Sequence, residues 1–319
     1  MPWNLIIFIL AFFGVWFGAG LAIRSVEKLS RSLHLSSFLV SFLVLGFFTS
    51  ISELSVGVNS LLVRDPEIYV GNLIGASLVL FMLVIPLLSI FGHGIHIRGE
   101  LQGLNLPFSL ITIAIPVLLS IDGRVSRTDG FVSLFFYLLL VILIQSKNKP
   151  LEKLKQTIHQ NNHSLSKTLF FVVTGVTIIF LSSHFLVEET IYFSQVFGVS
   201  PFLISLLVIA LGTNIPELSL VLRSAFSKNN QVAFGDYVGS AAFNTFLFAI
   251  LTIFGGQEVS LNNSYLVSLS FMIGGLSLFY YFARTKNTLS RLEGFVLLLF
   301  YICFIFTEVY LHKSAFLGL

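Results

Sequence analysis

Residues 36–55 read SSFLVSFLVLGFFTSISELS, and residues 200–219 read SPFLISLLVIALGTNIPELS. The two stretches align without a gap at the spacing that carries Glu53 onto Glu217, which we call the repeat offset. At the same offset GNLIG (71–75) falls on GDYVG (235–239). Apolar helices can look alike through composition alone. A shared Thr-x-x-x-Glu followed by Gly-x-x-x-Gly at one constant offset instead indicates an internal repeat.

The composition of the chain predicts a membrane protein. Of its 319 residues, 55% are hydrophobic and 10% are charged, whereas globular domains carry about 25% charged residues. A chain this apolar cannot cover its surface with polar groups, so its solvent is the lipid bilayer. The net charge of +3 does not predict nucleic-acid partners, because the basic residues lie in short loops between apolar stretches.

Apolar stretches of bilayer length predict an all-α membrane protein of about ten transmembrane helices. The stretches fall at 3–23, 36–63, 68–91, 104–121, 130–145, 167–187, 200–226, 231–256, 264–283 and 292–311. Each repeat then holds five helices, an odd number, so the second copy enters the membrane from the opposite face. We therefore expect two inverted five-helix repeats, 1–145 and 167–319, joined by a basic linker at 146–166.

The distribution of charge predicts the orientation of the chain. Fourteen of the 18 Lys and Arg residues lie on the side of the 146–166 loop, and the other four are Arg64, Arg124, Arg127 and Lys313. The positive-inside rule therefore predicts a cytoplasmic 146–166 loop and both termini outside. On the outer side we expect Glu188 and Glu189 to lie in a solvated loop. The compact chain fits a prokaryotic inner (plasma) membrane best.

Two glutamates lie near the middle of long apolar stretches. A carboxylate there costs about 2.5–3.5 kcal/mol on insertion scales, so Glu53 and Glu217 are candidates for a functional site. Each follows residues that open a helix, and Pro216 removes a backbone donor just before Glu217. Thr49 and Thr213 lie four residues before the glutamates and share their helix faces. Carboxylates, hydroxyls and freed carbonyls are hard oxygen ligands, which suit Ca²⁺ and Na⁺.

The helix after each glutamate supplies the second wall of the predicted site. In the second copy Asp236, Ser240 and Asn244 form a polar stripe at i, i+4 and i+8. The matching positions in the first copy are Asn72, Ala76 and Leu80, of which only the first is polar. The Gly-x-x-x-Gly pairs on these helices predict close packing against the glutamate-bearing helices.

These motifs resemble the two alpha repeats of the cation/calcium antiporter superfamily, the sodium/calcium exchanger membrane region. The usual form is GTSxPE followed by GNxxGSNxxN, and here the pairs are FTSISEL…GNLIGAS and GTNIPEL…GDYVGSAAFN. The resemblance implies a secondary active antiporter that exchanges Na⁺ for Ca²⁺ by alternating access. It also implies that the first and sixth helices slide over the core while the two glutamates hold each ion in turn.

The resemblance carries over residue by residue onto a predicted set of ion ligands. The matching residues are Thr49, Ser50, Glu53, Thr213, Glu217, Ser240 and Asn244. We add Asn214, which stands at the position of a motif serine, and as weaker members Asn72, Ser77 and Asp236. The departures from the usual pattern are Phe48, Ser52, Asn214, Ala76 and Leu80, which replace Gly, Pro, Ser, Ser and Asn. Ala76 and Leu80 remove two oxygen ligands from the first repeat, so they leave the coupling ion and the stoichiometry open.

Two other functions therefore stay open beside Na⁺/Ca²⁺ exchange. One is an antiporter of the same fold that is coupled to H⁺ or K⁺ or moves another cation, and the other is a membrane scaffold without transport. We expect no enzyme, because no nucleophile–base pair, phosphate loop or HExxH motif occurs. We likewise expect no cofactor and no nucleic acid, only transported Ca²⁺ and Na⁺ and the bilayer. The oligomeric state does not follow from the sequence.

Overall fold

The computed structural model describes residues 2–32, 46–97, 104–148, 165–227, 230–256, 258–261 and 265–312. In the first half the helices are α1 (Pro2–Ser32), α3 (Gly46–Thr49), α4 (Ile51–Leu62), α5 (Glu67–Val79), the π-helical turn η2 (Leu80–Val84), α6 (Ile85–Phe91), α7 (Asn105–Leu119) and α8 (Arg127–Asn148). In the second half they are α10 (Leu165–Phe197), α11 (Pro201–Ile204), η4 (Ser205–Ile209), α12 (Ala210–Thr213), α13 (Ile215–Ser227), α14 (Asn230–Gly255), α15 (Tyr265–Lys286) and α16 (Arg291–Leu311).

These helices confirm the predicted all-α membrane fold. Within the described ranges, seven helical segments are long and apolar enough to cross a bilayer, and α11–α13 pass the same test as one span bent by 43°. Two shorter apolar helices, Ile51–Leu62 and Asn105–Leu119, complete the ten predicted positions. The first part of the predicted span 36–63 lies outside the described residues.

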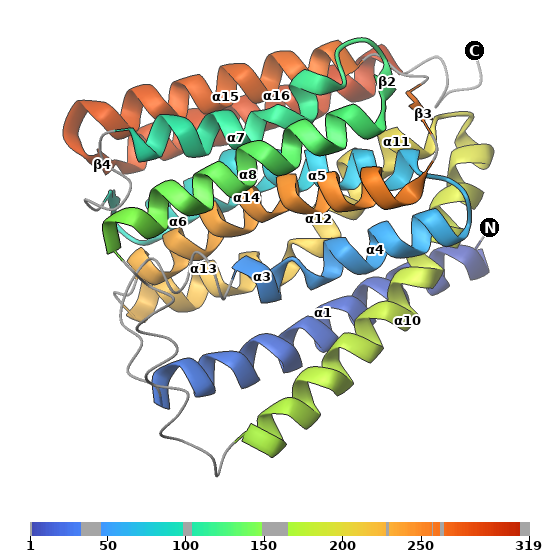
Figure 1. The fold of residues 1–319 in the computed structure, drawn as a ribbon, viewed down its shortest axis with the longest axis horizontal. Helices are drawn as coiled ribbons and strands as arrows, with labels where there is room; N and C mark the ends of the chain where they lie inside the picture. Colours follow the sequence, from blue (N-terminus) through green and yellow to red (C-terminus); the bar gives the residue numbers. More distant parts are fainter. Residues whose placement is uncertain are drawn as a thin grey trace.

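Two short strand pairs display the inverted symmetry of the repeats. Strand β1 (Ile95–His96) pairs antiparallel with β4 (Thr288–Leu289), and β2 (Arg124–Val125) pairs with β3 (Val259–Ser260). The repeat offset carries β1 onto β3 and β2 onto β4, so one strand pair is the image of the other. Each pair joins a loop of the first repeat to a loop of the second. Figure 1 shows β4 and β2 at opposite ends of the bundle.

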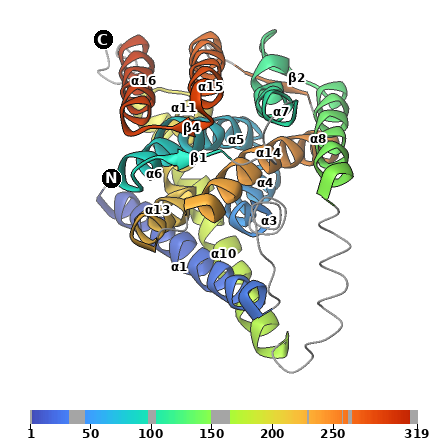
Figure 2. The same cartoon turned by 90° about the vertical axis from the view of Figure 1, so that its left-hand side faces the viewer.

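Helices α1 and α10 form an oblique pair on one flank of the bundle. Figures 1 and 2 show the pair apart from the block that contains α5, α14, α15 and α16. The crossing is close because glycines meet there. A Cβ on Gly18 would lie 2.7 Å from the carbonyl oxygen of Gly175, and a Cβ on Gly175 would lie 2.6 Å from that of Gly18.

The centre of the block is made by the helices that follow the glutamates. The most apolar stretch of the α5–α6 span has 83% of its residues buried, and that of α14 has 72% buried. In the other single-helix spans the corresponding share is only 22–33%. The predicted glycine packing is confirmed here. A Cβ on Gly75 of α5 would clash with the Leu206 carbonyl oxygen of η4, and a Cβ on Gly46 of α3 would lie 2.7 Å from the Gly239 backbone of α14. Each of these central helices therefore packs against the broken helix of the other repeat.

The structure corrects the expectation for Glu188 and Glu189. Both lie inside α10, which continues to Phe197 rather than ending near residue 187. Glu189 is buried, and its Oε1 accepts a 3.5 Å hydrogen bond from Asn4 Nδ2 of α1. Glu188 pairs with His184 one turn before it. The charge of the two glutamates suggests a loop, but packing of α10 against α1 keeps the segment helical.

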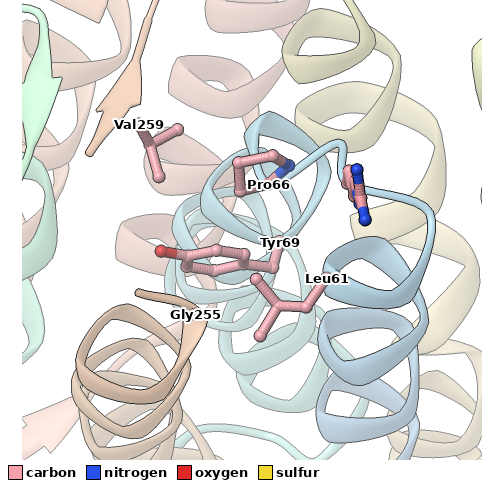
Figure 3. Close-up of a pocket in the computed structure, with 6 residues that line it drawn as sticks. Leu61, Pro66, Tyr69, Gly255 and Val259 are labelled. Carbon is pink, nitrogen blue, oxygen red and sulfur yellow. The ribbon is translucent and has the colours of Figure 1, made fainter. Parts of the chain in front are cut away.

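A cavity of about 210 Å³ lies at the end of the bundle where α4 ends and α5 begins. It is lined by Leu61, Arg64, Pro66, Tyr69, Gly255 and Val259. Figure 3 shows the Tyr69 ring lying across this space beside Leu61. The Tyr69 hydroxyl forms a 3.0 Å hydrogen bond with the Thr252 hydroxyl. No predicted ion ligand is among these lining residues, so the cavity is separate from the site described next.

Candidate functional site

Two helix breaks place the glutamates at the start of new helices. The helical run stops at Ser50 between α3 and α4, and at Asn214 between α12 and α13, two positions that the repeat offset superposes. Glu53 and Glu217 therefore lie in the first turns of α4 and α13. The N-terminus of a helix carries a partial positive charge, which stabilises a carboxylate there.

The threonines before the breaks connect the two repeats through matched contacts. Thr49 Oγ1 donates to Asp236 Oδ1 at 3.4 Å, and Thr213 Oγ1 donates to Asn72 Oδ1 at the same 3.4 Å. The repeat offset maps one pair onto the other. The fold thus builds the same contact twice, with a carboxylate in one copy and an amide in the other.

Two further contacts cross the interface between the repeats, and a third lies within α4. The hydroxyls of Ser50 and Ser240 form a hydrogen bond of 2.9 Å. Asn214 Nδ2 donates to Glu53 Oε1 at 3.4 Å, and Ser52 Oγ lies 3.0 Å from Glu53 Oε2. Glu53 and Asp236 lie close enough to Glu217 for their charges to interact with it. All of these side chains are at most 1% exposed.

Several buried polar atoms of this site have no hydrogen-bond partner among the described residues. They are both carboxylate oxygens of Glu217, both side-chain polar atoms of Asn244, Nδ2 of Asn72 and Oδ1 of Asn214. An unpaired buried acceptor costs about 1–3 kcal/mol, and more when it is charged. So many unpaired oxygens in one apolar region are suited to bind a dehydrated cation.

The structure brings together most of the predicted ligands. Hydrogen bonds join four pairs of them: Thr49 with Asp236, Ser50 with Ser240, Thr213 with Asn72, and Asn214 with Glu53. Asn244 lies one turn beyond Ser240 on the same face of α14. Ser77 does not join the site, because its hydroxyl donates to the Leu73 carbonyl in its own helix. Ala76 and Leu80 are fully buried and offer only hydrocarbon.

Two residues at the site are not among the predicted ligands. Ser52, which the sequence marks only as a missing proline, contacts Glu53. Tyr237 is fully buried and donates its hydroxyl to the backbone carbonyl of Glu217 at 3.1 Å. The first repeat has Leu73 at the matching position. The sequence signal that could have identified Tyr237 is its polar hydroxyl between the two motif glycines Gly235 and Gly239. Within the described ranges, no three His, Cys, Asp or Glu side chains cluster as metal ligands, so any bound cation would depend on mixed oxygen ligands.

Two inverted helix bundles whose broken helices meet at a buried carboxylate site define the architecture of a secondary transporter. The sequence profile of the sodium/calcium exchanger protein family matches residues 3–145 and 167–310. The chain belongs to this family. It is therefore a multi-pass integral membrane protein of a family of cation antiporters, not of enzymes.

Comparisons with individual proteins agree with this assignment. The chain is 21% identical to the inner membrane protein YrbG of Escherichia coli over 72% of its own length and 73% of that protein. It is 29% identical to the sodium/calcium exchanger MaX1 of Methanosarcina acetivorans, over 46% of the chain and 42% of that protein. A solved structure of the sodium-calcium exchanger NCX_Mj, soaked with Na⁺ and Sr²⁺, superposes with a TM-score of 0.67 at 22% identity, covering 95% of this chain and 98% of that one.

Proposed function

We propose that this protein exchanges Na⁺ for Ca²⁺ across a membrane by alternating access around Glu53 and Glu217. The observation that carries the proposal is the pair of buried carboxylates at matched helix breaks, surrounded by hydroxyl and amide oxygens. Oxygen ligands in a flexible arrangement suit both Ca²⁺ and Na⁺. The names of MaX1 and NCX_Mj as sodium/calcium exchangers support the same pair of ions.

The mobile element in this proposal is the α1–α10 pair. Its connection to the broken helices includes a hydrogen bond of 3.3 Å from Trp16 Nε1 to Ser219 Oγ, and bonds of 2.8 and 3.2 Å from Asn59 Nδ2 to Ser183 Oγ and the Phe180 carbonyl. The strand pairs instead tie loops of the remaining block together at both ends. Sliding of α1 and α10 would open the site to one side of the membrane at a time.

The proposed topology divides the chain into repeats at 1–145 and 167–319 with a cytoplasmic linker at 146–166. Both termini would lie outside, and the membrane would be a prokaryotic inner membrane. The relative YrbG of Escherichia coli, named as an inner membrane protein, supports this location. Cysteine labelling from either side of the membrane tests the orientation.

A second candidate is exchange of Ca²⁺ against H⁺ or K⁺. The observation that favours it is the hydrocarbon at Ala76 and Leu80, where Ser240 and Asn244 face the site from the other repeat. Fewer oxygen ligands leave fewer places for sodium ions.

Uptake of ⁴⁵Ca²⁺ into proteoliposomes separates the two candidates. The vesicles are loaded with Na⁺, with K⁺, or with a buffer that sets a pH gradient. Uptake that requires internal Na⁺ supports Na⁺/Ca²⁺ exchange, whereas uptake driven by K⁺ or by the pH gradient in its absence supports the second candidate. No uptake under any gradient would reject both.

A further inference from the structure

The two glutamates of the site differ in their hydrogen bonding. Glu53 has a donor group beside each oxygen. Asn214 Nδ2 lies 3.4 Å from Oε1, and Ser52 Oγ, whose single proton is shared between Glu53 and the Thr49 carbonyl at 3.1 Å, lies 3.0 Å from Oε2. The orientation of the Asn214 amide is determined by a second bond of 2.8 Å from Nδ2 to the Ala210 carbonyl. An amide oxygen could not lie against that carbonyl, so Asn214 faces Glu53 as a donor.

The carboxylate of Glu217 has no such hydrogen-bond donors beside it among the described residues. Both of its carboxylate oxygens are buried and lack a hydrogen-bond partner among the described residues. The repeat explains the difference, because its offset places Pro216 on Ser52 and Ser50 on Asn214. Proline carries no hydroxyl, and the Ser50 hydroxyl is engaged with Ser240 at 2.9 Å.

We propose that Ser52 and Asn214 are positioning residues that hold Glu53 as a fixed ligand, and that the transported cation is bound chiefly by meeting the unpaired carboxylate of Glu217. This inference rests on the proposed function, since it assigns unequal roles to the two glutamates of that site. Asn214 belongs to the second repeat and Glu53 to the first. The break in one half therefore sets the geometry of the ligand in the other half.

The same two positions are departures from the usual motif of the family, which has proline and serine there. Both replacements add a donor at Glu53, while Ala76 and Leu80 take ligand oxygens away from the same repeat. Hydrogen bonds to a ligand carboxylate typically account for about 10–100-fold in metal affinity. Hydrogen bonds that hold Glu53 in place would thus compensate for the ligand oxygens that the first repeat lacks at Ala76 and Leu80.

The test is Ca²⁺ binding to the full chain in lipid nanodiscs, measured as a dissociation constant by equilibrium titration with ⁴⁵Ca²⁺. Ser52→Ala removes one donor, and Asn214→Ser withdraws the other through its shorter side chain. Each change is expected to raise the dissociation constant for Ca²⁺ about tenfold. Ser52→Thr keeps the hydroxyl, so its dissociation constant is expected to stay that of the unaltered chain. The matched control is Ser60→Ala in the same helix, because the Ser60 hydroxyl donates to the Gly57 carbonyl of that helix. Its dissociation constant is expected to match that of the unaltered chain.

A Glu53→Gln background separates positioning from a general structural effect. If the two residues act through Glu53, Ser52→Ala and Asn214→Ser have no further effect on residual binding in this background. Equal losses in both backgrounds, or unchanged binding in both single variants, would overturn the inference. The titration is repeated with Na⁺ as the probe. If the unaltered chain binds Na⁺ but not Ca²⁺, the proposed exchange is rejected, and the Na⁺ titrations of the variants still test whether Ser52 and Asn214 position Glu53. If it binds neither ion, the proposed exchange and the positioning role are both rejected.

Discussion

The crossing of α1 and α10 offers a matched pair of glycine substitutions. A Cβ at Gly18 would meet the Gly175 carbonyl oxygen at 2.7 Å and an Ile179 side-chain carbon at 2.9 Å, whereas a Cβ at Gly20 would have no neighbour within 4 Å. Both glycines lie in α1, one on either side of Ala19. Gly18→Ala and Gly20→Ala therefore differ only in what the new methyl group touches.

The expected magnitudes follow from two opposing contributions. Alanine in place of glycine stabilises a helix by about 1 kcal/mol at either position. At Gly18 the contact distances are several tenths of an ångström too short, and overpacking of this kind costs about 1–3 kcal/mol. We expect Gly20→Ala to raise stability by about 1 kcal/mol and Gly18→Ala to leave it unchanged or lower it by up to about 2 kcal/mol.

The assay is thermal unfolding of the purified protein in detergent, followed by the loss of helical circular dichroism. The expected outcome is a midpoint several degrees lower for Gly18→Ala than for Gly20→Ala. The exchange rate would fall in parallel, because the two mobile helices would no longer pack at their crossing. Identical midpoints for both variants would refute the close approach of α1 and α10.

Three further predictions concern the site itself. Ala76→Ser and Leu80→Asn restore oxygen ligands to the first repeat, so we expect stronger dependence of Ca²⁺ uptake on Na⁺, seen as a lower half-saturating Na⁺ concentration. Asp236→Asn gives the second repeat the side chain that the first repeat has at Asn72, and it removes a negative charge near the ions. We therefore expect the dissociation constant for Ca²⁺ to rise about tenfold or more. An unchanged dissociation constant would exclude Asp236 from the site. Tyr237→Phe removes the hydrogen bond to the Glu217 carbonyl, and we expect about 1 kcal/mol lower stability in thermal unfolding, with ion selectivity unchanged.

Much of the fold could be predicted from the sequence because the repeat is present in both copies. The constant offset that relates Glu53 to Glu217 predicts the inverted bundles, and apolar stretches predict the spans. The ends of α10 could not be predicted in the same way. Glu189 suggests a loop by its charge, and only the contact with Asn4 of α1 shows why it is buried in a helix.

The site was predictable at the level of residues but not of contacts. Thr49 and Thr213 are identifiable from their spacing to the glutamates. Their partners Asp236 and Asn72 lie 187 and 141 residues away along the chain, and no local pattern encodes such pairing. Ser52 illustrates the same limit, since a single sequence shows a missing proline but not a hydroxyl beside a carboxylate.

The proposed exchange depends on the binding of transported Ca²⁺ by Glu53 and Glu217. The most direct test is ⁴⁵Ca²⁺ uptake into Na⁺-loaded proteoliposomes by the unaltered chain, by Glu53→Gln and by Glu217→Gln, with Ser60→Ala as a control for reconstitution. Each glutamine keeps the size of the side chain and removes one of the charges that neutralise the ion. We expect uptake in the unaltered chain and the control, and none above background in either glutamine variant. Normal uptake by Glu217→Gln would contradict the proposal.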